Sequence, residues 1–448
     1  MMNRDYSRRA FIRQQAFVGL GMMGLSTLGC ASGGSDRTGD KVAGVEAPTI
    51  RDMNLAAIRD RYHRALFDEF LPNMDQYVID HDLGGFMCNV DILTRKPVTT
   101  DKRAWFEGRG MWAYAFLYNH FDQNPAYLEV ARKSRDFILP RLPAGDRFYP
   151  TSFSREGAPR SADEGDIYGN LFVAEGLAEY AKASGERQYY DQAKDIVLKA
   201  VARYDRDDYT YPYKSDSRRE GPRILGHWMI LISVATQLLK QEADPQIQAL
   251  ADRCAEAILT DHINAEHGLV NEAIGHDMKP LADPMALQYA DLGHGCEAFA
   301  FVMAYAVFRK DAKLFDRASA RFKHHVEVAT DPVYGGHFTS LPNTDDYQWT
   351  LNKSRWVQEE ILIGALHLIE HRADPWAIQR FLDTDAYIQE KFVRPEYAFV
   401  IDSGDRKLDK HSQVRAENYH RPRQLMVCML AFDRIRENGY RPSGLFEQ

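Results

Sequence analysis

Gly335-Gly336-His337-Phe338 is one of six short glycine and aromatic segments that divide this chain at intervals of about 60 residues. Between these segments apolar residues recur at every third or fourth position, as at Leu55, Ile58 and Tyr62, which is helical periodicity. Each interval is long enough for two helices, and strand patterns are scarce. The other five segments are Gly84-Gly85-Phe86, Arg147-Phe148-Tyr149, Tyr209-Thr210-Tyr211, Gly268-Leu269-Val270 and Tyr397-Ala398-Phe399.

This period predicts six helix pairs. The even-numbered helices are the more apolar and contain small residues such as Gly176, Ala298 and Gly364, as an inner ring with neighbours on both sides requires. The last helix is apolar over residues 425–430, whereas an open helical repeat needs a polar end, so a closed ring is favoured. We therefore predict an all-α fold, an (α/α)6 barrel formed by a single domain over residues 51–440. The predicted spans are 52–80, 105–122, 124–140, 168–184, 187–204, 224–243, 245–263, 286–309, 311–328, 353–372, 374–393 and 415–437.

Composition indicates a soluble protein with a large core. Of 448 residues, 45% are hydrophobic and 27% are charged, which is ordinary for a globular chain. The net charge of -8 includes no long run of one sign, so we expect no nucleic-acid partner and take a small molecule as the default partner. Five cysteines lie far apart, without metal-binding or redox spacings, and the last four are predicted to be free core thiols.

The N-terminus predicts export. Ser7-Arg8-Arg9-Ala10-Phe11-Ile12-Arg13 precedes an apolar stretch, residues 16–28, that is too short for a stable membrane span. It looks like a twin-arginine signal, so residues 1–30 are interpreted as a signal and 31–50 as a flexible linker. Residues 27–31 also resemble a lipoprotein cleavage site. The protein is thus expected to be periplasmic, or anchored to a membrane only through a lipid on Cys30.

Unusual polar residues collect near the N-terminal ends of the even-numbered helices. In a closed barrel these six ends meet at one mouth, where unpaired N–H groups and the positive ends of the helix dipoles favour negative charge. An anionic intermediate would be stabilised there. The residues are Arg109, Asn170, His227, His294 with Glu297, Trp356 with Glu360, and His420 with Arg423.

Four motifs at these helix starts carry a resemblance to a known family. They are residues 101–112, with Lys102, Trp105, Gly108-Arg109 and Trp112; Gly293-His294-Gly295-Cys296-Glu297-Ala298; residues 353–360, with Lys353, Trp356, Gln358 and Glu360; and Tyr419-His420-Arg421-Pro422-Arg423. Together with Gly84-Gly85-Phe86 they resemble the N-acylglucosamine 2-epimerase family, which includes cellobiose 2-epimerases and aldose-ketose isomerases. The resemblance extends over nearly all of residues 52–437.

The resemblance implies a sugar 2-epimerase or an aldose-ketose isomerase. Inverting carbon 2 of a reducing sugar requires removal of the proton beside the aldehyde and return of a proton to the other face, and histidine suits both transfers. By resemblance His294 and His420 are the proton-transfer pair, and which of them abstracts the proton is left open. Because Glu297 lies three residues after His294, we expect it to orient that imidazole. By resemblance Arg109 lies beside the sugar oxygens and stabilises the enediolate.

Seven further residues are expected to bind the sugar, and neither a metal nor a cofactor is predicted. Two histidines and a glutamate could form a facial metal triad, but the family chemistry does not need one. No glycine loop suited to a nucleotide phosphate is present. The expected substrate-binding residues are Trp356, Glu360, Lys353, Arg423, Asn170, His227 and Trp105.

Two departures from the family pattern bear on the substrate. Arg355 stands where the family often has a tryptophan, and Met229 stands where cellobiose epimerases have a histidine, which weakens a disaccharide assignment. Arg355, Arg415 and Arg421 near the same mouth suggest an acidic sugar.

Two other functions remain open. A polysaccharide hydrolase or lyase on the same barrel would need two carboxylates across the mouth, for which Glu297 and Glu360 are the candidates. A non-catalytic glycan-binding lipoprotein would need aromatic platforms alone. The sugar, the choice between epimerisation and isomerisation, and a monomeric or homodimeric state are also left open by the sequence.

Overall fold

The computed structural model describes residues 47–162, 164–211 and 221–447. The predicted signal, Cys30 and nearly all of the predicted linker lie outside the described residues. None of the helices within these ranges combines the length and the hydropathy needed to cross a membrane.

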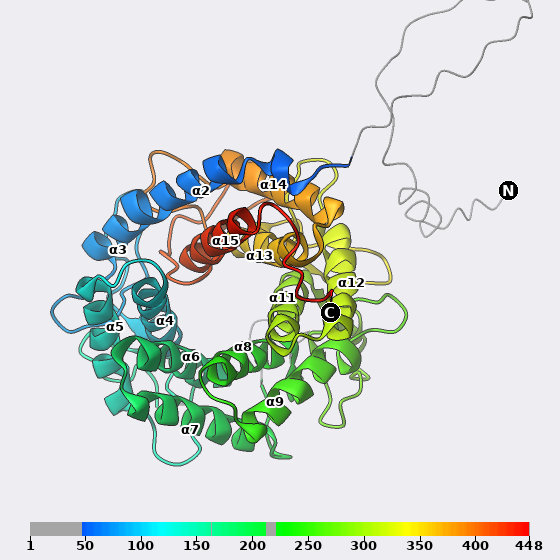
Figure 1. Cartoon of the computed structure of the whole chain (residues 1–448). Coiled ribbons are helices and arrows are strands. Elements are labelled where there is room, and N and C mark those ends of the chain that lie inside the picture. Colours follow the sequence, from blue (N-terminus) through cyan, green and yellow to red (C-terminus); the bar gives the residue numbers. More distant parts are fainter. Residues whose placement is uncertain (1–46, 163, 212–220, 448) are drawn as a thin grey trace, which may run out of the picture. The chain divides into compact units, whose positions relative to one another are not determined.

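Two concentric rings of helices make up the described part of the chain (Figure 1). The inner ring consists of α4 (Ala104–His120), α6 (Ile167–Ser184), α8 (Leu225–Gln241), α11 (Leu292–Arg309), α13 (Arg355–Arg372) and α15 (His420–Glu437). The outer ring begins with the continuous run α2 (Leu55–His63), η2 (Arg64–Phe70) and α3 (Leu71–Tyr77), and continues with α5 (Pro125–Ile138), α7 (Arg187–Tyr204), α9 (Pro245–Glu256) extended by η5 (Ala257–Asp261), α12 (Ala312–Ala329) and α14 (Pro375–Lys391). Inner and outer helices alternate along the chain, which is the predicted (α/α)6 barrel. Short helices η1 (Ile50–Met53), η3 (Leu139–Arg141) and α10 (Pro284–Leu287) lie between them.

The two rings differ in burial as their sequences predict. Helix α6 is buried without interruption from Ile167 to Ala181, whereas α12 buries a single stripe that includes Phe315 and Phe322. Inner helices also approach one another closely: a Cβ atom on Gly176 would lie 2.5 Å from the carbonyl oxygen of Gly108 on α4. Small residues are therefore a packing requirement of the inner ring.

Three outer helices start with the same local device. In Asn124-Pro125, Asp244-Pro245 and Asp374-Pro375 the capping side chain accepts a hydrogen bond from a backbone N–H of the first turn. The proline follows at the first helical position, where its missing N–H costs nothing. These pairs fix where each outer helix begins.

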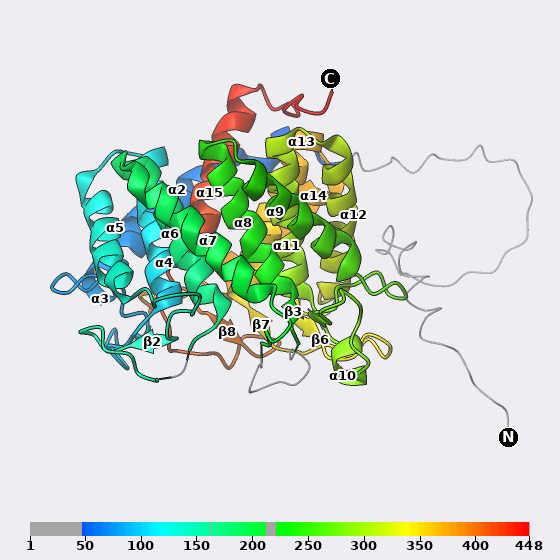
Figure 2. The same cartoon turned by 90° about the horizontal axis from the view of Figure 1, so that it is seen from below.

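Four two-residue antiparallel ladders lie at the end of the barrel where the inner helices begin (Figure 2). The first strand of each ladder runs directly into an inner helix, so the ladder fixes the position of that helix start. The pairs are β1 (Lys102–Arg103) with β2 (Ser152–Phe153), β3 (Arg223–Ile224) with β4 (Ala273–Ile274), β5 (Ala290–Asp291) with β6 (Ser340–Leu341), and β7 (Lys353–Ser354) with β8 (Ser403–Gly404).

The ring closes between the first and last helices in both layers. In the outer layer, Asp385 of α14 pairs with Arg61 and accepts a hydrogen bond of 2.8 Å from the hydroxyl of Tyr62 on α2. In the inner layer, Asn418 just before α15 donates to the carbonyl of Phe106 on α4 at 2.8 Å. Closure therefore depends on residues more than 300 positions apart.

Two predicted helix starts are wrong. The span 286–309 begins only at Leu292, because Pro284–Leu287 forms the separate helix α10 and Ala290–Asp291 forms β5. The span 415–437 begins only at His420, because residues 413–416 pair with residues 88–92 as extended chain. The four described cysteines are free and buried, as predicted.

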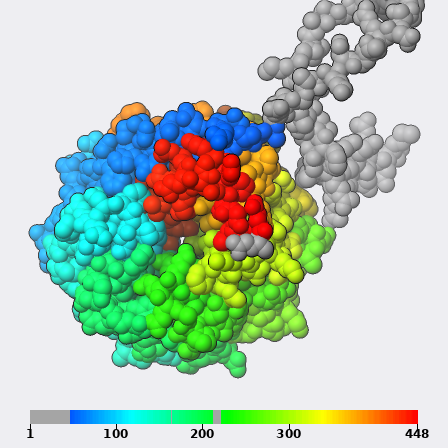
Figure 3. All heavy atoms as spheres, viewed as in Figure 1, coloured from blue at the N-terminus to red at the C-terminus, as the bar shows by residue number. Residues whose placement is uncertain are grey.

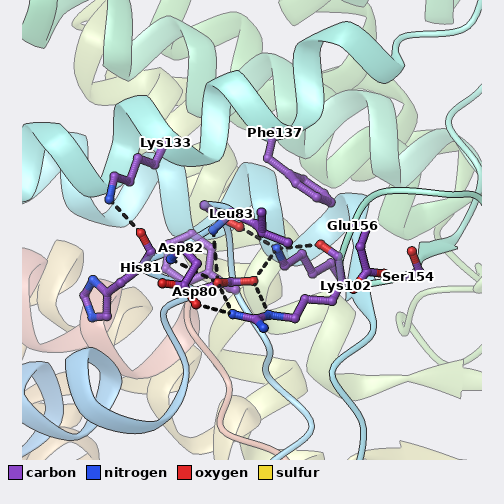
Figure 4. Close-up of polar contacts among 12 residues, drawn as sticks. Asp80, His81, Asp82, Leu83, Lys102, Lys133, Phe137, Ser154 and Glu156 are labelled. Atoms are coloured by element: carbon purple, nitrogen blue, oxygen red, sulfur yellow. Dashed lines mark hydrogen bonds and ion pairs between the residues drawn. The ribbon is translucent and has the colours of Figure 1, made fainter.

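A buried ion-pair network occurs twice. Asp80 lies 2.9 Å from the ammonium of Lys102 and 2.8 Å from the guanidinium of Arg155, and Lys102 donates to the carbonyl of Gly84 (Figure 4). About 250 residues later, Asp331, Lys353 and Arg406 repeat this arrangement, with distances of 2.9 and 2.7 Å. In both copies the lysine ties a glycine turn to the start of an inner helix.

Candidate active site

A cavity of about 290 Å³ lies among the starts of the inner helices. A larger cavity of about 910 Å³ occupies the other end of the barrel, where Figure 3 looks into it, and includes Glu175, Lys240 and His367. The sequence motifs lie at the smaller cavity, so that is the candidate site. Its lining residues are Trp105, Arg109, Tyr168, Phe172, Tyr211, Ile224, Met229, Ile230, Glu272, His294, Glu297, Ser354, Trp356, Asp402, Arg415 and His420.

Both histidines are held at Nδ1 by a buried carboxylate. His294, in the first turn of α11, has its Nδ1 2.8 Å from Oε1 of Glu272. His420, the first residue of α15, has its Nδ1 2.9 Å from Oε1 of Glu360. A carboxylate at Nδ1 sets the tautomer and the ring orientation, so that Nε2 is the nitrogen left for chemistry.

The two imidazoles flank one indole ring. The ring centroid of Trp356 lies 5.8 Å from that of His294 and 5.5 Å from that of His420. Trp356 thereby sets the spacing of the two histidines on the cavity wall. Both imidazoles also line the same cavity, so one bound molecule could contact both.

Glu297 was expected to orient His294, but the carboxylate at Nδ1 of His294 is that of Glu272. Spacing of three residues places both on one helix face, but Glu297 lies a turn deeper and Glu272 holds the imidazole instead. Among the described residues, Oε1 of Glu297 has no hydrogen-bond partner, and Arg423 is 4.0 Å away. Burial and the neighbouring Glu360 raise the pKa of Glu297, which favours a protonated carboxyl at the cavity.

The other two glutamates at His420 are ionised. Burial would raise the pKa of Glu360, but the Arg423 guanidinium and His420 lower it below its ordinary value. Burial also opposes ionisation of Glu417, yet His420, Arg109 and Arg355 lower its pKa to about 2.

Burial lowers the pKa of His420, and Glu417 and Glu360 only partly oppose this. His420 is therefore neutral at neutral pH, with its Nδ1–H donated to Glu360.

Arg109 and Trp105 of α4 also line the cavity. The Arg109 guanidinium lies 4.0 Å from the ring centre of Phe172 and 3.6 Å from Glu417. The Trp105 indole donates to Asp166 at 3.1 Å. Stacking and pairing hold the Arg109 cation in place at the cavity.

Five expected substrate-binding residues are not among the described residues that line the cavity. Glu360 and Arg423 lie beneath it, bonded to each other and, through Glu360, to His420. For the other three the expectation is corrected. Asn170 accepts a hydrogen bond from the backbone N–H of Tyr149. Lys353 belongs to the buried network with Asp331. His227 is fully buried, and its ring packs against the rings of Tyr168, Tyr204, Tyr209 and Tyr211.

Two of the three arginines that suggested an acidic substrate are already paired. Arg355 pairs with Glu359, and Arg421 lies 3.7 Å from the same carboxylate. Both are buried, so neither can meet a substrate. Arg415, in contrast, lines the cavity.

Two groups of metal-ligand types lie at the site. One contains Glu272, Asp291 and His294, and the other contains Glu297, Glu360 and His420; within each group the ligand atoms lie within 4.8 Å of one another. The two histidines fall in different groups, so they do not form the triad considered from the sequence. In the second group, Glu360 is already bonded to Arg423 and His420.

Sequence reasoning missed Glu272 and Glu417. Glu272 follows the Gly268-Leu269-Val270 segment, one of the six that lie at the helix starts, and this placement was a usable signal. Glu417 precedes α15 and accepts the backbone N–H groups of Tyr419 and His420 at 3.0 and 2.9 Å. An acidic residue three positions before a motif histidine was the corresponding signal.

Comparison with known proteins identifies the relatives of this chain. The model of the N-acylglucosamine 2-epimerase family matches residues 84–422. The N-acylglucosamine 2-epimerase of Bos taurus is 25% identical over 394 residues, which cover 84% of this chain and 91% of that protein. The cellobiose 2-epimerase of Bacteroides fragilis is 19% identical over 361 residues, covering 74% and 87% of the two chains.

Solved structures share the fold. The cellobiose 2-epimerase of Spirochaeta thermophila superposes with a TM-score of 0.74 at 20% identity, covering 87% of this chain and all of that one (100%). A D-mannose isomerase superposes with a TM-score of 0.68 at 14% identity, covering 85% and 97%. A family 76 glycoside hydrolase from Bacteroides thetaiotaomicron does so with a TM-score of 0.58 at 12% identity, covering 85% and 100%. At these identities the likeness establishes the barrel.

Proposed function

Because the chain belongs to the N-acylglucosamine 2-epimerase family, we propose that it epimerises or isomerises a reducing sugar at carbon 2, with His294 and His420 as the proton-transfer pair. One observation carries the proposal: two imidazoles, each fixed at Nδ1 by a buried carboxylate, flank the same indole on one cavity. Relatives named N-acylglucosamine 2-epimerase and cellobiose 2-epimerase support the same reaction class.

His420 is the base in one direction of the reaction. Its neutral form carries the Nδ1 proton towards Glu360, so Nε2 can accept the proton from carbon 2. The imidazolium that forms is stabilised by the ionised Glu360 and Glu417 nearby. His294, protonated and paired with Glu272, then gives its own proton to the opposite face of the carbon, and proton exchange with water restores both histidines; the reverse reaction exchanges these roles.

The cavity stabilises the enediolate between the two transfers. Arg109 is held at the cavity wall by Phe172 and Glu417, where its guanidinium meets the developing oxyanion. The protonated carboxyl of Glu297 can donate a hydrogen bond to a sugar oxygen. Epimerisation returns the proton to carbon 2, and isomerisation returns it to carbon 1.

Exchange of the carbon 2 proton tests this proposal. We expect His294→Asn and His420→Asn each to lower the exchange rate of reducing aldoses in heavy water by about 100-fold or more, as for loss of a general acid or base. NMR of the sugar measures the exchange, and circular dichroism verifies the fold. His367→Asn is the matched control, because His367 lies on the inner helix α13 but at the other cavity. Wild-type exchange in both site variants would contradict the assignment.

A hydrolase has weaker support. Glu360, one of its two candidate carboxylates, is fully buried beneath the cavity and is bonded to Arg423 and His420. Hydrolysis also needs two carboxyl groups at the bound sugar, one on each side of the bond to be broken. A hydrolase would release a second sugar without carbon 2 exchange, so the same NMR experiment separates the two functions.

A further inference from the structure

Arg415 stands apart from the other charged residues of the cavity. Its guanidinium makes no hydrogen bond or ion pair within the described residues, and its nearest aromatic contact is Phe106, at 5.7 Å from the ring centre. Its Nε is buried. A buried donor without a partner costs free energy unless a ligand satisfies it.

The other charges on the cavity wall are already compensated. Arg109 lies 3.6 Å from Glu417, and Glu272 is bonded to His294. Asp402 lies 3.7 Å from Arg355. Arg415 also acts on Glu417, whose pKa it helps to lower, but unlike Arg109 it forms no ion pair within the described residues.

The backbone holds Arg415 in a conformation that side chains rarely adopt. Its φ is +109°, in the region that favours glycine. Its backbone N–H donates to the carbonyl of Val90 at 2.9 Å, and that of Ala416 donates to Cys88 at 2.9 Å, so neighbouring chain fixes the angle. Arginine occupies a backbone position that suits glycine, and its side chain lines the cavity, which indicates that the side chain has a function there.

We propose that the substrate is an acidic sugar whose carboxylate or sulfate group, away from carbon 2, binds the guanidinium of Arg415. This rests on the proposed function and narrows its substrate class. A cavity of about 290 Å³ accommodates about one sugar ring, so the anionic group belongs to the ring that reacts. The guanidinium offers the paired donors that either anion accepts.

Matched sugars test the proposal on the full chain. We expect carbon 2 exchange with kcat/KM about 10-fold or more higher for glucuronate or glucose 6-sulfate than for glucose, since a charge-assisted hydrogen bond is worth about that factor. Comparison of glucuronate with glucose 6-sulfate shows whether Arg415 binds a carboxylate or a sulfate. Arg415→Gln lowers kcat/KM for the acidic sugars towards the value for glucose and so removes the preference.

Two further variants distinguish the effect of the Arg415 side chain from the effect of its backbone conformation and from that of any positive charge near the cavity. Arg415→Gly suits a φ of +109° and so keeps or raises stability while abolishing the preference. Arg103→Gln removes the same charge from an exposed site at the same end of the barrel and keeps the preference.

The acidic-substrate proposal is overturned if Arg415→Gln leaves the ratio of kcat/KM for acidic and neutral sugars unchanged, or if the wild type prefers glucose. In either case carbon 2 exchange itself still supports the proposed function. Absence of exchange with every sugar in the panel counts against the proposed function, and with it against this inference.

Discussion

His420 illustrates how the site tunes a single residue. Two carboxylates lie beside it, yet burial dominates and lowers the pKa of its imidazole. The carboxylates therefore do not keep the ring protonated. They hold its orientation and, on the proposed mechanism, stabilise the cation that forms when the ring takes a proton from the sugar.

This balance predicts the pH dependence. A base must be neutral to accept a proton, so kcat/KM falls as the pH falls through the pKa of His420. Because burial lowers that pKa below its ordinary value of 6.5, we expect the acidic limb of kcat/KM for carbon 2 exchange to lie below pH 6.5. The pH profile of the exchange measures it, with circular dichroism at each pH as the control. An acidic limb above pH 6.5 would contradict the assignment of His420 as the neutral base.

The sequence predicted which residues lie at the site better than it predicted which of them contact one another. The motifs located both histidines, Arg109 and Trp356, because each lies at an inner helix start and the barrel brings those starts together. The partner of His294 was missed, because Glu272 reaches it from a loop between other helices and no local spacing reports that contact.

Among the elements, the short ladders and buried networks position the inner helices. Lys353 was expected to bind sugar, but Lys102 makes the same contacts in the first copy of the network. Both lysines lie next to an aspartate that is fully buried. Their shared geometry indicates a shared structural task.

Substitution of each lysine in turn tests whether Lys102 and Lys353 have the same structural role. We expect Lys102→Met and Lys353→Met each to lower the free energy of unfolding by about 2 to 4 kcal/mol, because the buried Asp80 or Asp331 loses its ammonium partner and keeps one ion pair, to Arg155 or Arg406. Denaturant unfolding measures the loss, and exchange per folded molecule is expected to stay near wild type in both. Were Lys353→Met to lose exchange at wild-type stability, Lys353 would have to touch the sugar.

Helix positions were predictable where the signal was local. The apolar periodicity located the outer helices, and the structure adds cap-proline pairs such as Asp374-Pro375 at three of their starts. The starts of α11 and α15 were predicted too early, because β5 pairs with β6 and residues 413–416 pair with residues 88–92. Such long-range pairings override a helical pattern in the sequence.

At the scale of the molecule, the closed ring depends on its last helix. Helix α15 packs between α13 and α4 and supplies His420. Residues 438–447 follow it and lie against the ring (Figure 1), where the backbone N–H of Ser443 donates to the carbonyl of Glu370 at 2.8 Å. That extension contacts the ring at His371, whose Nδ1 lies 2.7 Å from the hydroxyl of Ser443.

Two truncations separate these parts. A chain ending at Val414 is expected to lose the cooperative unfolding transition and all exchange, because it lacks both the ring closure and His420. A chain ending at Glu437 is expected to keep exchange within about threefold and to lose about 1 to 2 kcal/mol of stability. Calorimetry and the exchange assay measure both. Cooperative unfolding of the shorter chain at the wild-type temperature would show that the ring does not need α15.

Helix α15 follows the other five inner helices in the chain, so the ring can close only after α15 has been synthesised. A prematurely terminated product lacks one of the two histidines and also exposes the apolar flanks of α4 and α13, which marks it for proteolysis. On the proposed mechanism, activity therefore appears only after α15 has been synthesised and has closed the ring.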